Sequence, residues 1–222
     1  MQLKSCLRDD CLAEFINGLE QLGLSCCNSQ ADQFWHYLEL LIQWNKAYNL
    51  TAAKAPYEIL KVHIFDSLSI LSHLEGDRFI DVGTGAGLPG IPLAIMSPKS
   101  DFTLLDSNGK KTRFLFHVRT KLRLDNVKEI NTRVEHYRPE KPFDMVITRA
   151  YSKLTAMLAS CAHLATKRTI FVAMKGKEPH LEMQSIPDRY DILSLKKLSV
   201  PGLERDRHII KIKAQDILGK TL

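Results

Sequence analysis

FIDVGTGAGLPGIPLAIM, residues 79–96, is the stretch that decides the fold of this 222-residue chain. A short apolar run ends in glycines at positions 83, 85, 87 and 90, and another apolar segment follows them at once. Glycine adopts positive φ and has no Cβ, so the backbone of such a turn can lie directly against a ligand. The pattern predicts a strand, a tight turn and a helix N-terminus that together bind a nucleoside-like cofactor.

From residue 79 onward, short β-type runs alternate with helical runs. The expected strands are 79–82, 102–105, 127–130, 143–148 and 170–174, and the expected helices between them are 88–96, 110–123 and 154–164. This alternation predicts a parallel sheet with helices on both faces. Two further runs, 190–200 and 208–213, have no helix between them, so we expect an antiparallel C-terminal hairpin.

The first 75 residues have a different pattern, because apolar residues such as Leu12, Phe15 and Leu19 recur at helical spacing. We therefore expect an N-terminal helical cap over residues 1–75 and an α/β domain over residues 76–222. The cap holds 5 Lys/Arg and 9 Asp/Glu, a net charge of −4, and the rest of the chain holds 26 and 16, a net charge of +10. The positive excess of the second part is typical of a protein that binds a polyanion such as nucleic acid.

Composition excludes several classes of protein. No apolar stretch approaches the roughly 18 residues of a membrane span, and the first ten residues lack the apolar region of a secretory signal. The five cysteines fit neither a zinc site nor a Cys-x-x-Cys pair, so we expect free thiols in a reducing cytoplasm. The histidines show no metal-like grouping, and we expect no metal. Nothing in the sequence requires more than a monomer.

Two acidic residues flank the glycine turn. Asp106 follows Gly83 by 23 residues, a spacing that lets a carboxylate reach the ribose hydroxyls of a nucleoside on the turn. The alternative is that Asp106, with Ser107, caps the helix that starts near Lys110; we favour the ribose role. Asp81 stands two residues before the first glycine, where it can meet the ammonium group of a cofactor or simply hydrogen-bond the loop.

The turn fits two classes of cofactor. Residues 85–90 match the dinucleotide pattern Gly-x-Gly-x-x-Gly, but Pro89 and Pro92 crowd the position where a pyrophosphate would meet the helix amides. The acid at Asp81, followed by Gly-x-Gly-x-Gly, suits a cofactor without phosphates that carries an amino-acid group and an adenosine. This arrangement is the pattern of enzymes that use S-adenosylmethionine.

Eight short motifs, taken in order, carry a resemblance to a known family. They are WNKAYNLT (44–51), HIFDSL (63–68), DVGTGAGLPGIP (81–92), LDSNGKK (105–111), RVE (133–135), TRA (148–150), KG (175–176) and RH (207–208). The chain resembles the RsmG family, also called glucose-inhibited division protein B, the bacterial 16S ribosomal RNA (guanine-N7) methyltransferases. The resemblance implies a class I, Rossmann-like methyltransferase fold with a helical extension, S-adenosylmethionine as cofactor, and a guanine of the small ribosomal subunit as acceptor.

The same resemblance assigns roles to single residues. It implies cofactor contacts at Gly83, Leu88, Val134, Glu135 and Arg149. With Gly85 of the turn and Asp106, these are the expected cofactor-binding residues. The resemblance also places His63 and Asp66, three residues apart on one helical face, toward the site alongside Asn49; without it, they would be read as a surface pair or a cap.

The expected reaction needs no general base. N7 of guanine has a lone pair and no proton, so alignment of the two reactants would supply most of the rate. A donor must read the neighbouring O6 instead, and Arg149 and Lys110 are the candidate catalytic residues for that contact. The alternative for Arg149 is an ion pair with a carboxylate of the site. Three other functions stay open: a small-molecule methyltransferase, a nucleotide-linked oxidoreductase, and a non-catalytic rRNA-binding protein.

The helix expected over residues 110–123 carries six Lys/Arg and no acid. We expect its N-terminal end to contact phosphates, and Arg119 and Lys121 to lie on a solvated face. Trp44 and Tyr48 are four residues apart and could stack on a base, although we expect Trp44 to pack in the core.

Overall fold

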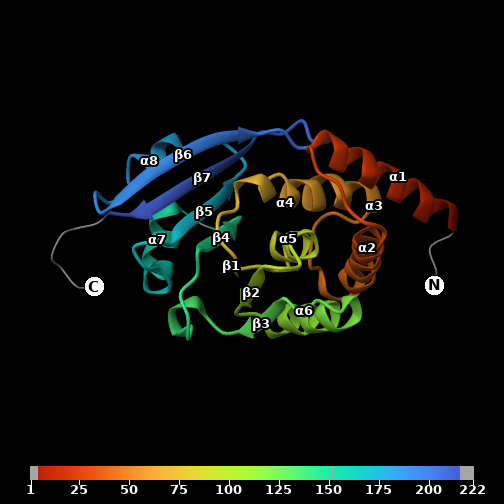
Figure 1. Cartoon of the computed structure of the whole chain (residues 1–222), viewed down its shortest axis with the longest axis horizontal. Helices are drawn as coiled ribbons and strands as arrows, with labels where there is room; N and C mark the ends of the chain where they lie inside the picture. Colours follow the sequence, from red (N-terminus) through yellow and green to blue (C-terminus); the bar gives the residue numbers. More distant parts are fainter. Residues whose placement is uncertain (1–4, 152, 216–222) are drawn as a thin grey trace.

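The computed structural model describes residues 5–151 and 153–215, and its centre is one seven-stranded sheet (Figure 1). The strand order is β3-β2-β1-β4-β5-β7-β6. The strands are β1 (Arg78–Val82), β2 (Asp101–Asp106), β3 (Val127–Asn131), β4 (Met145–Arg149), β5 (Ile170–Lys175), β6 (Tyr190–Leu198) and β7 (Arg207–Ala214). β1 to β5 are parallel, and β7 pairs antiparallel with both β5 and β6. The parallel sheet and the C-terminal hairpin that the sequence predicted are both confirmed.

Helices cover both faces of the sheet because strand side chains alternate between two apolar clusters. Phe79 and Ile147 belong to the larger cluster, under α5 (Gly90–Met96) and α6 (Gly109–Leu122). Ile80 and Val146 point the other way, into a smaller cluster with α7 (Leu154–Cys161) and the 3₁₀ turn η4 (Ala162–Leu164). A short helix, α8 (His180–Met183), which the sequence did not predict, lies before β6.

The N-terminal residues form a second helical layer over α5 and α6 (Figure 1). α1 (Ser5–Gln21) and α2 (Asn28–Tyr48) come first, followed by three consecutive helical segments and the 3₁₀ turn η2 (Leu71–His73). The consecutive segments are α3 (Pro56–Ile59), the π-helical η1 (Leu60–Phe65) and α4 (Asp66–Leu68). Phe15 and Phe65 of this layer share one apolar cluster with Phe79 of β1. The division into domains at residue 75 therefore stays a prediction, although it does fall between η2 and β1.

The turn between β6 and β7 reaches back to the helical layer. Leu198 and Val200, at the end of β6 and just beyond it, lie in the same apolar cluster as Phe65. A Cβ on Gly202 would stand 2.8 Å from the Lys61 side chain, so the turn packs closely against η1. This contact brings the start of β7 beside α4 and fixes the position of Arg207.

Some details differ from the sequence-based expectations. The helix expected from residue 88 begins at Gly90, because Gly87 has a φ of +90° and Leu88 precedes a proline, which disfavours the helical conformation. A 3₁₀ turn, η3 (Val134–His136), was not predicted. Cys11, Cys26, Cys27 and Cys161 are free, as expected, whereas the side chain of Cys6 lies outside the described part. Within the described residues, no helix is both long and apolar enough to span a bilayer.

Candidate cofactor and acceptor site

A hollow of about 520 Å³ opens at the carboxyl ends of β1 to β4. This is the edge where open α/β sheets bind their ligands, and the volume is within the range of small-molecule sites. The hollow is lined by Val82, Gly83, Leu105, Asp106, Ser107, Lys111, Thr132, Arg133, Val134, Glu135, Arg149, Ala150 and Tyr151. Loops after four different strands therefore converge on one space, as the sequence pattern indicated.

Glycine stands at the positions of this turn for two different structural reasons. Gly83 and Gly85 have φ of +72° and +62°, and a Cβ built on either would have no atom closer than 3.8 Å. A Cβ on Gly87 would stand 2.5 Å from Ile91, and one on Gly90 would stand 2.1 Å from Leu104. Gly87 and Gly90 are thus required for packing, whereas Gly83 and Gly85 leave open space on the side of the turn where a ligand would lie.

Asp106 holds the turn in place. Its Oδ2 accepts from the N–H of Gly85 at 2.9 Å, and its Oδ1 accepts from the N–H of Asn108 at 2.8 Å. The helix cap suggested for Asp106 and Ser107 is wrong, because Asn108 is the N-cap of α6 and accepts from the Lys110 N–H at 2.9 Å. Asp106 also lines the hollow, and each of its oxygens keeps a second lone pair with which to accept from a ribose hydroxyl, so the ribose contact stays a prediction.

Asp81 lies beneath the turn and is 1% exposed. Its Oδ2 accepts from Thr84 Oγ1 at 2.7 Å and from the Gly90 N–H at 2.9 Å, and its Oδ1 has no hydrogen-bond partner. Burial raises the pKa of Asp81 to about 6, against the lowering effect of these two donors. Loop bonding, one of the two roles weighed for Asp81, is therefore confirmed, and one oxygen remains buried and unpaired.

The structure brings together most of the residues expected at the cofactor. Gly83, Asp106, Val134, Glu135 and Arg149 all line the hollow. Two others do not line it: Gly85 reaches it through its bond to Asp106, and Leu88 is 5% exposed within the larger apolar cluster. Lys110, the second candidate catalytic residue, points to solvent. Their predicted roles stay predictions.

The lysine of α6 that lines the hollow is Lys111 and not Lys110. The Nζ of Lys111 lies 3.6 Å from Asp106 Oδ2, while the neighbouring Lys110 is the exposed one. Neighbouring residues on a helix point in directions about 100° apart. The sequence does not show how the helix is rotated about its axis, so it does not tell which of the two lysines faces the hollow.

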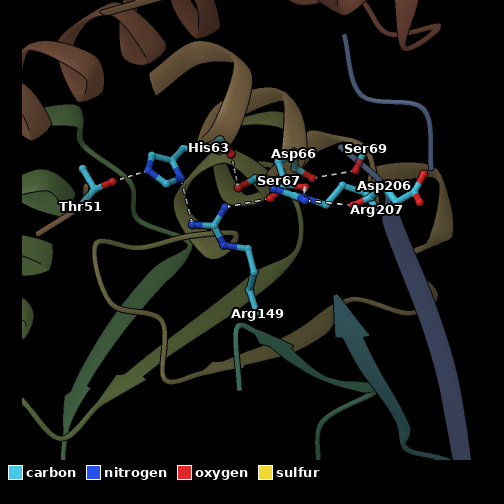
Figure 2. A network of polar contacts seen from close by, with 8 residues as sticks. All are labelled: Thr51, His63, Asp66, Ser67, Ser69, Arg149, Asp206 and Arg207. Carbon is cyan, nitrogen blue, oxygen red and sulfur yellow. Dashed lines mark hydrogen bonds and ion pairs between the residues drawn. The ribbon is translucent and has the colours of Figure 1, made fainter. Parts of the chain in front are cut away.

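Arg149, at the end of β4, anchors a polar network that joins the sheet to the helical layer (Figure 2). Its Nη1 donates to Asp66 Oδ2 at 3.2 Å, and its Nη2 donates to His63 Nδ1 at 3.3 Å. Arg207 of β7 donates from Nε to the other oxygen of Asp66 at 2.9 Å. The ion pair weighed as the alternative for Arg149 is therefore present, and His63 and Asp66 both contact this residue of the hollow.

The hydrogen bonds fix the protonation of His63. An arginine only donates, so Nδ1 of His63 must accept from Arg149 and carries no proton. Nε2 then holds the proton and donates to Thr51 Oγ1, which leaves a neutral imidazole. Burial, together with the charge of Arg149, lowers the pKa of His63 to about 4. The imidazole is therefore neutral near pH 7, with its single lone pair occupied.

Several residues of this network were missed or misplaced by the sequence analysis. Thr51 and Arg207 appeared only inside family motifs, with no role, because the residues that they contact lie far away in the chain. Arg119 is not on a freely solvated face: its Nε donates to Glu129 Oε2 of β3 at 2.7 Å. Trp44 packs on Phe114, with ring centroids 5.5 Å apart, as expected of a core residue.

Comparison with known proteins agrees with this geometry. Residues 30–210 match the sequence profile of the family described as rRNA small subunit methyltransferase G. The chain belongs to that family. A protein of that name from Klebsiella pneumoniae subsp. pneumoniae is 50% identical over 195 residues, which cover 88% of this chain and 94% of the relative. One from Escherichia coli O1:K1 is 46% identical over 199 residues, covering 90% and 96%. The recognition made from the motifs is confirmed.

Solved structures of methyltransferases share the fold. A SAM-dependent methyltransferase from Aquifex aeolicus superposes with a TM-score of 0.54 at 15% identity, covering 70% of this chain and 93% of the other. TYW2 from M. jannaschii, solved in complex with AdoMet, gives 0.51 at 15% identity, covering 69% and 76%. The mostly parallel, Rossmann-like methyltransferase fold with N-terminal helices is therefore confirmed for this member of the family.

Proposed function

We propose that this protein transfers a methyl group from S-adenosylmethionine to N7 of a guanine in the 16S rRNA of the small ribosomal subunit. The relatives' names support small-subunit rRNA as the class of substrate. The observation that favours an acceptor such as N7 is the network around Arg149, where the possible proton acceptors are already engaged by arginines. We also propose that the protein acts in the cytoplasm as a monomer.

The residues of the hollow fit the cofactor. Gly83 and Gly85 leave the turn open toward a ligand, and Asp106 and Glu135 offer carboxylates at the ends of β2 and β3, where ribose hydroxyls and an adenine would lie. The buried, unpaired Oδ1 of Asp81 places negative charge beneath the turn, which suits a cationic cofactor more than a pyrophosphate.

S-adenosylmethionine, when bound, supplies a methyl group activated by the positive sulfonium. The protein's contribution is to bind and align the acceptor. Arg149 has three N–H groups left after its bonds to Asp66 and His63, and we assign it the guanine O6, which leaves N7 free to react. Asp66 carries the negative charge closest to that guanidinium, so it holds the arginine in place.

The protonation of the network argues against acceptors that must lose a proton. Methylation of an exocyclic amine or a ribose hydroxyl releases a proton that a side chain has to take. The lone pair of His63 accepts from Arg149, and Asp66 is buried, ion-paired with two arginines and outside the lining of the hollow, so neither group is placed to take a proton from an acceptor. Guanine N7 requires no such base, so rate would come from alignment of the two reactants.

The test is transfer of a labelled methyl group to small subunits purified from cells that lack this protein. Digestion of the labelled rRNA and chromatography of its nucleosides should give 7-methylguanosine alone. Free nucleosides and metabolites should stay unlabelled. Label on a metabolite, on an exocyclic amine or on a 2′-hydroxyl would refute the proposal, and calorimetry with NAD against S-adenosylmethionine would separate it from an oxidoreductase.

A further inference from the structure

The cations of α6 fall into two groups that the sequence does not separate. Arg119 is paired with Glu129 at 2.7 Å, and Lys111 lies 3.6 Å from Asp106. Within the described residues, no ion pair joins an acid to Lys110, Arg113 or Lys121. With His117, these residues are spaced three, four and four positions apart, which places them along one side of the helix. We call Lys110, Arg113, His117 and Lys121 the basic row.

The basic row begins next to the cofactor hollow and extends from there beside α2. Trp44 of α2 lies with its ring centroid 5.7 Å from that of His117, and the Gln33 side chain of α2 donates to the Leu122 carbonyl at 2.9 Å. The two helices therefore pack against each other (Figure 1). The row begins one residue before Lys111, which lines the hollow, and spans about 16 Å at the rise of an α-helix.

A second hollow, of about 740 Å³, opens between α2 and α6 at the far end of the row. It is lined by Asp32, Gln33, His36, His117, Thr120, Lys121, Leu122 and Arg123. Its one acid, Asp32, is paired with Arg8 at 2.6 Å. The row therefore connects two concave surfaces, and its positive charge is not neutralised from within the described chain.

The first residue of the row opposes the helix dipole. Lys110 and Lys111 stand in the first turn of α6, which has no acidic residue, so their charges oppose the positive end of the helix dipole. Lys110 and Arg113, three positions apart on the helix, are like charges that repel each other. A row that is exposed and holds three cations and no acid is complementary to a polyanion.

An aromatic ring is exposed next to the row. Tyr48, the last residue of α2, is 46% exposed, and its ring centroid lies 5.2 Å from that of Trp44, which in turn contacts His117. Protein surfaces that follow single-stranded nucleic acid combine a positive track with aromatic rings on which bases stack. Tyr48 and the basic row together have both features.

We propose that the RNA strand flanking the target guanine runs along α6 on the side of α2, with its phosphates on the basic row and a flanking base stacked on Tyr48. This inference rests on the proposed function, because the hollow at the start of the row is where the target base would enter. It assigns a specific face and specific residues to the contact with rRNA.

The test compares two double variants with the same change in charge. R113Q/K121Q removes two cations from the row. K99Q/K141Q removes two exposed cations that precede β2 and β4, at the opposite edge of the sheet from the cofactor hollow. Binding to small subunits lacking the modification is measured by filter binding at several salt concentrations, and binding of S-adenosylmethionine is measured by calorimetry.

We expect R113Q/K121Q to weaken subunit binding about tenfold and to reduce the slope of log K against log salt by about 1.4, since each phosphate contact to a single strand contributes roughly 0.7. Its affinity for S-adenosylmethionine should match that of the wild type. K99Q/K141Q should change subunit binding less than twofold. The variant Y48A should weaken binding at least fivefold with the salt slope unchanged, because stacking is not ionic.

Equal effects of the two double variants, or none from R113Q/K121Q, would overturn the inference. A photocrosslinker placed at Thr120, exposed beside the row, should attach to rRNA; attachment only to a ribosomal protein would also overturn it. Failure of the proposed function has a different signature, namely wild-type protein that binds subunits without transferring label. In that case the binding comparison still decides the inference.

Discussion

The neutral, buried His63 makes a quantitative prediction about stability and pH. We expect the substitution His63→Gln to remove a pH dependence that the wild type has. Glutamine is uncharged at every pH, and it can still accept from Arg149 and donate to Thr51. The pKa of His63 is lowered from 6.5 to about 4 in the folded protein, by burial first and the Arg149 charge second.

The sign follows from proton binding. Between pH 6.5 and about pH 4, the unfolded chain binds a proton at this histidine and the folded protein does not, so the free energy of unfolding falls as the pH falls. From these two pKa values, the loss between pH 7.5 and pH 4.5 is about 2.5 kcal/mol. Asp81 acts in the opposite direction, because its raised pKa favours the folded protein at lower pH, but this effect is common to wild type and variant.

The assay is urea denaturation of both proteins at pH 7.5 and pH 4.5, followed by tryptophan fluorescence. Between pH 7.5 and pH 4.5, the free energy of unfolding of the wild type should fall by about 2.5 kcal/mol more than that of H63Q. If both proteins lose the same stability, within about 0.5 kcal/mol, the histidine is not held neutral by the fold. The argument for an acceptor that needs no base would then lose its support.

Three further predictions test the rest of the site. Asp66→Asn should lower the free energy of unfolding by about 2–3 kcal/mol in urea titrations, since two arginines lose their shared, 4% exposed carboxylate. Gly83→Ala should weaken S-adenosylmethionine binding at least tenfold by calorimetry and cost about 1 kcal/mol of stability, whereas Gly87→Ala should cost about 2–4 kcal/mol because its Cβ would clash with packed side chains. Arg119→Gln should change stability by at most about 1 kcal/mol and leave methylation unaltered, because it breaks only a partly exposed ion pair. Larger effects on methylation from Arg119 than from Asp66 would contradict this picture of the site.

Local sequence patterns predicted the strands and helices well, for a reason visible at β1. Each parallel strand here is short, apolar and followed by turn residues, so the residues next to the strand indicate where it begins and ends. β1 was expected at 79–82 and spans Arg78–Val82. The same locality accounts for the turn, where Gly83, Gly85 and Gly87 have the positive φ that glycine favours, although Gly90 does not.

Contacts between distant elements could not be predicted in the same way. Asp66 meets Arg149 across 83 positions of chain and Arg207 across 141, and no local pattern encodes such a pairing. Of the two roles weighed for Asp106, the helix cap is wrong and the ribose contact stays a prediction, and the structure adds a bond to the Gly85 N–H. Only the packing of β2 against β1 makes that bond available.

The sequence by itself determined the class of fold, the edge of the sheet that carries the site, and the family, because these depend on residue order and on the period of apolar residues. The tertiary structure alone decided which lysine of α6 enters the hollow, that His63 is neutral, and which cations of α6 are left without an acid. Charge, burial and hydrogen bonding depend on neighbours in space, and those neighbours are set only when the helical layer, the sheet and the C-terminal hairpin pack together.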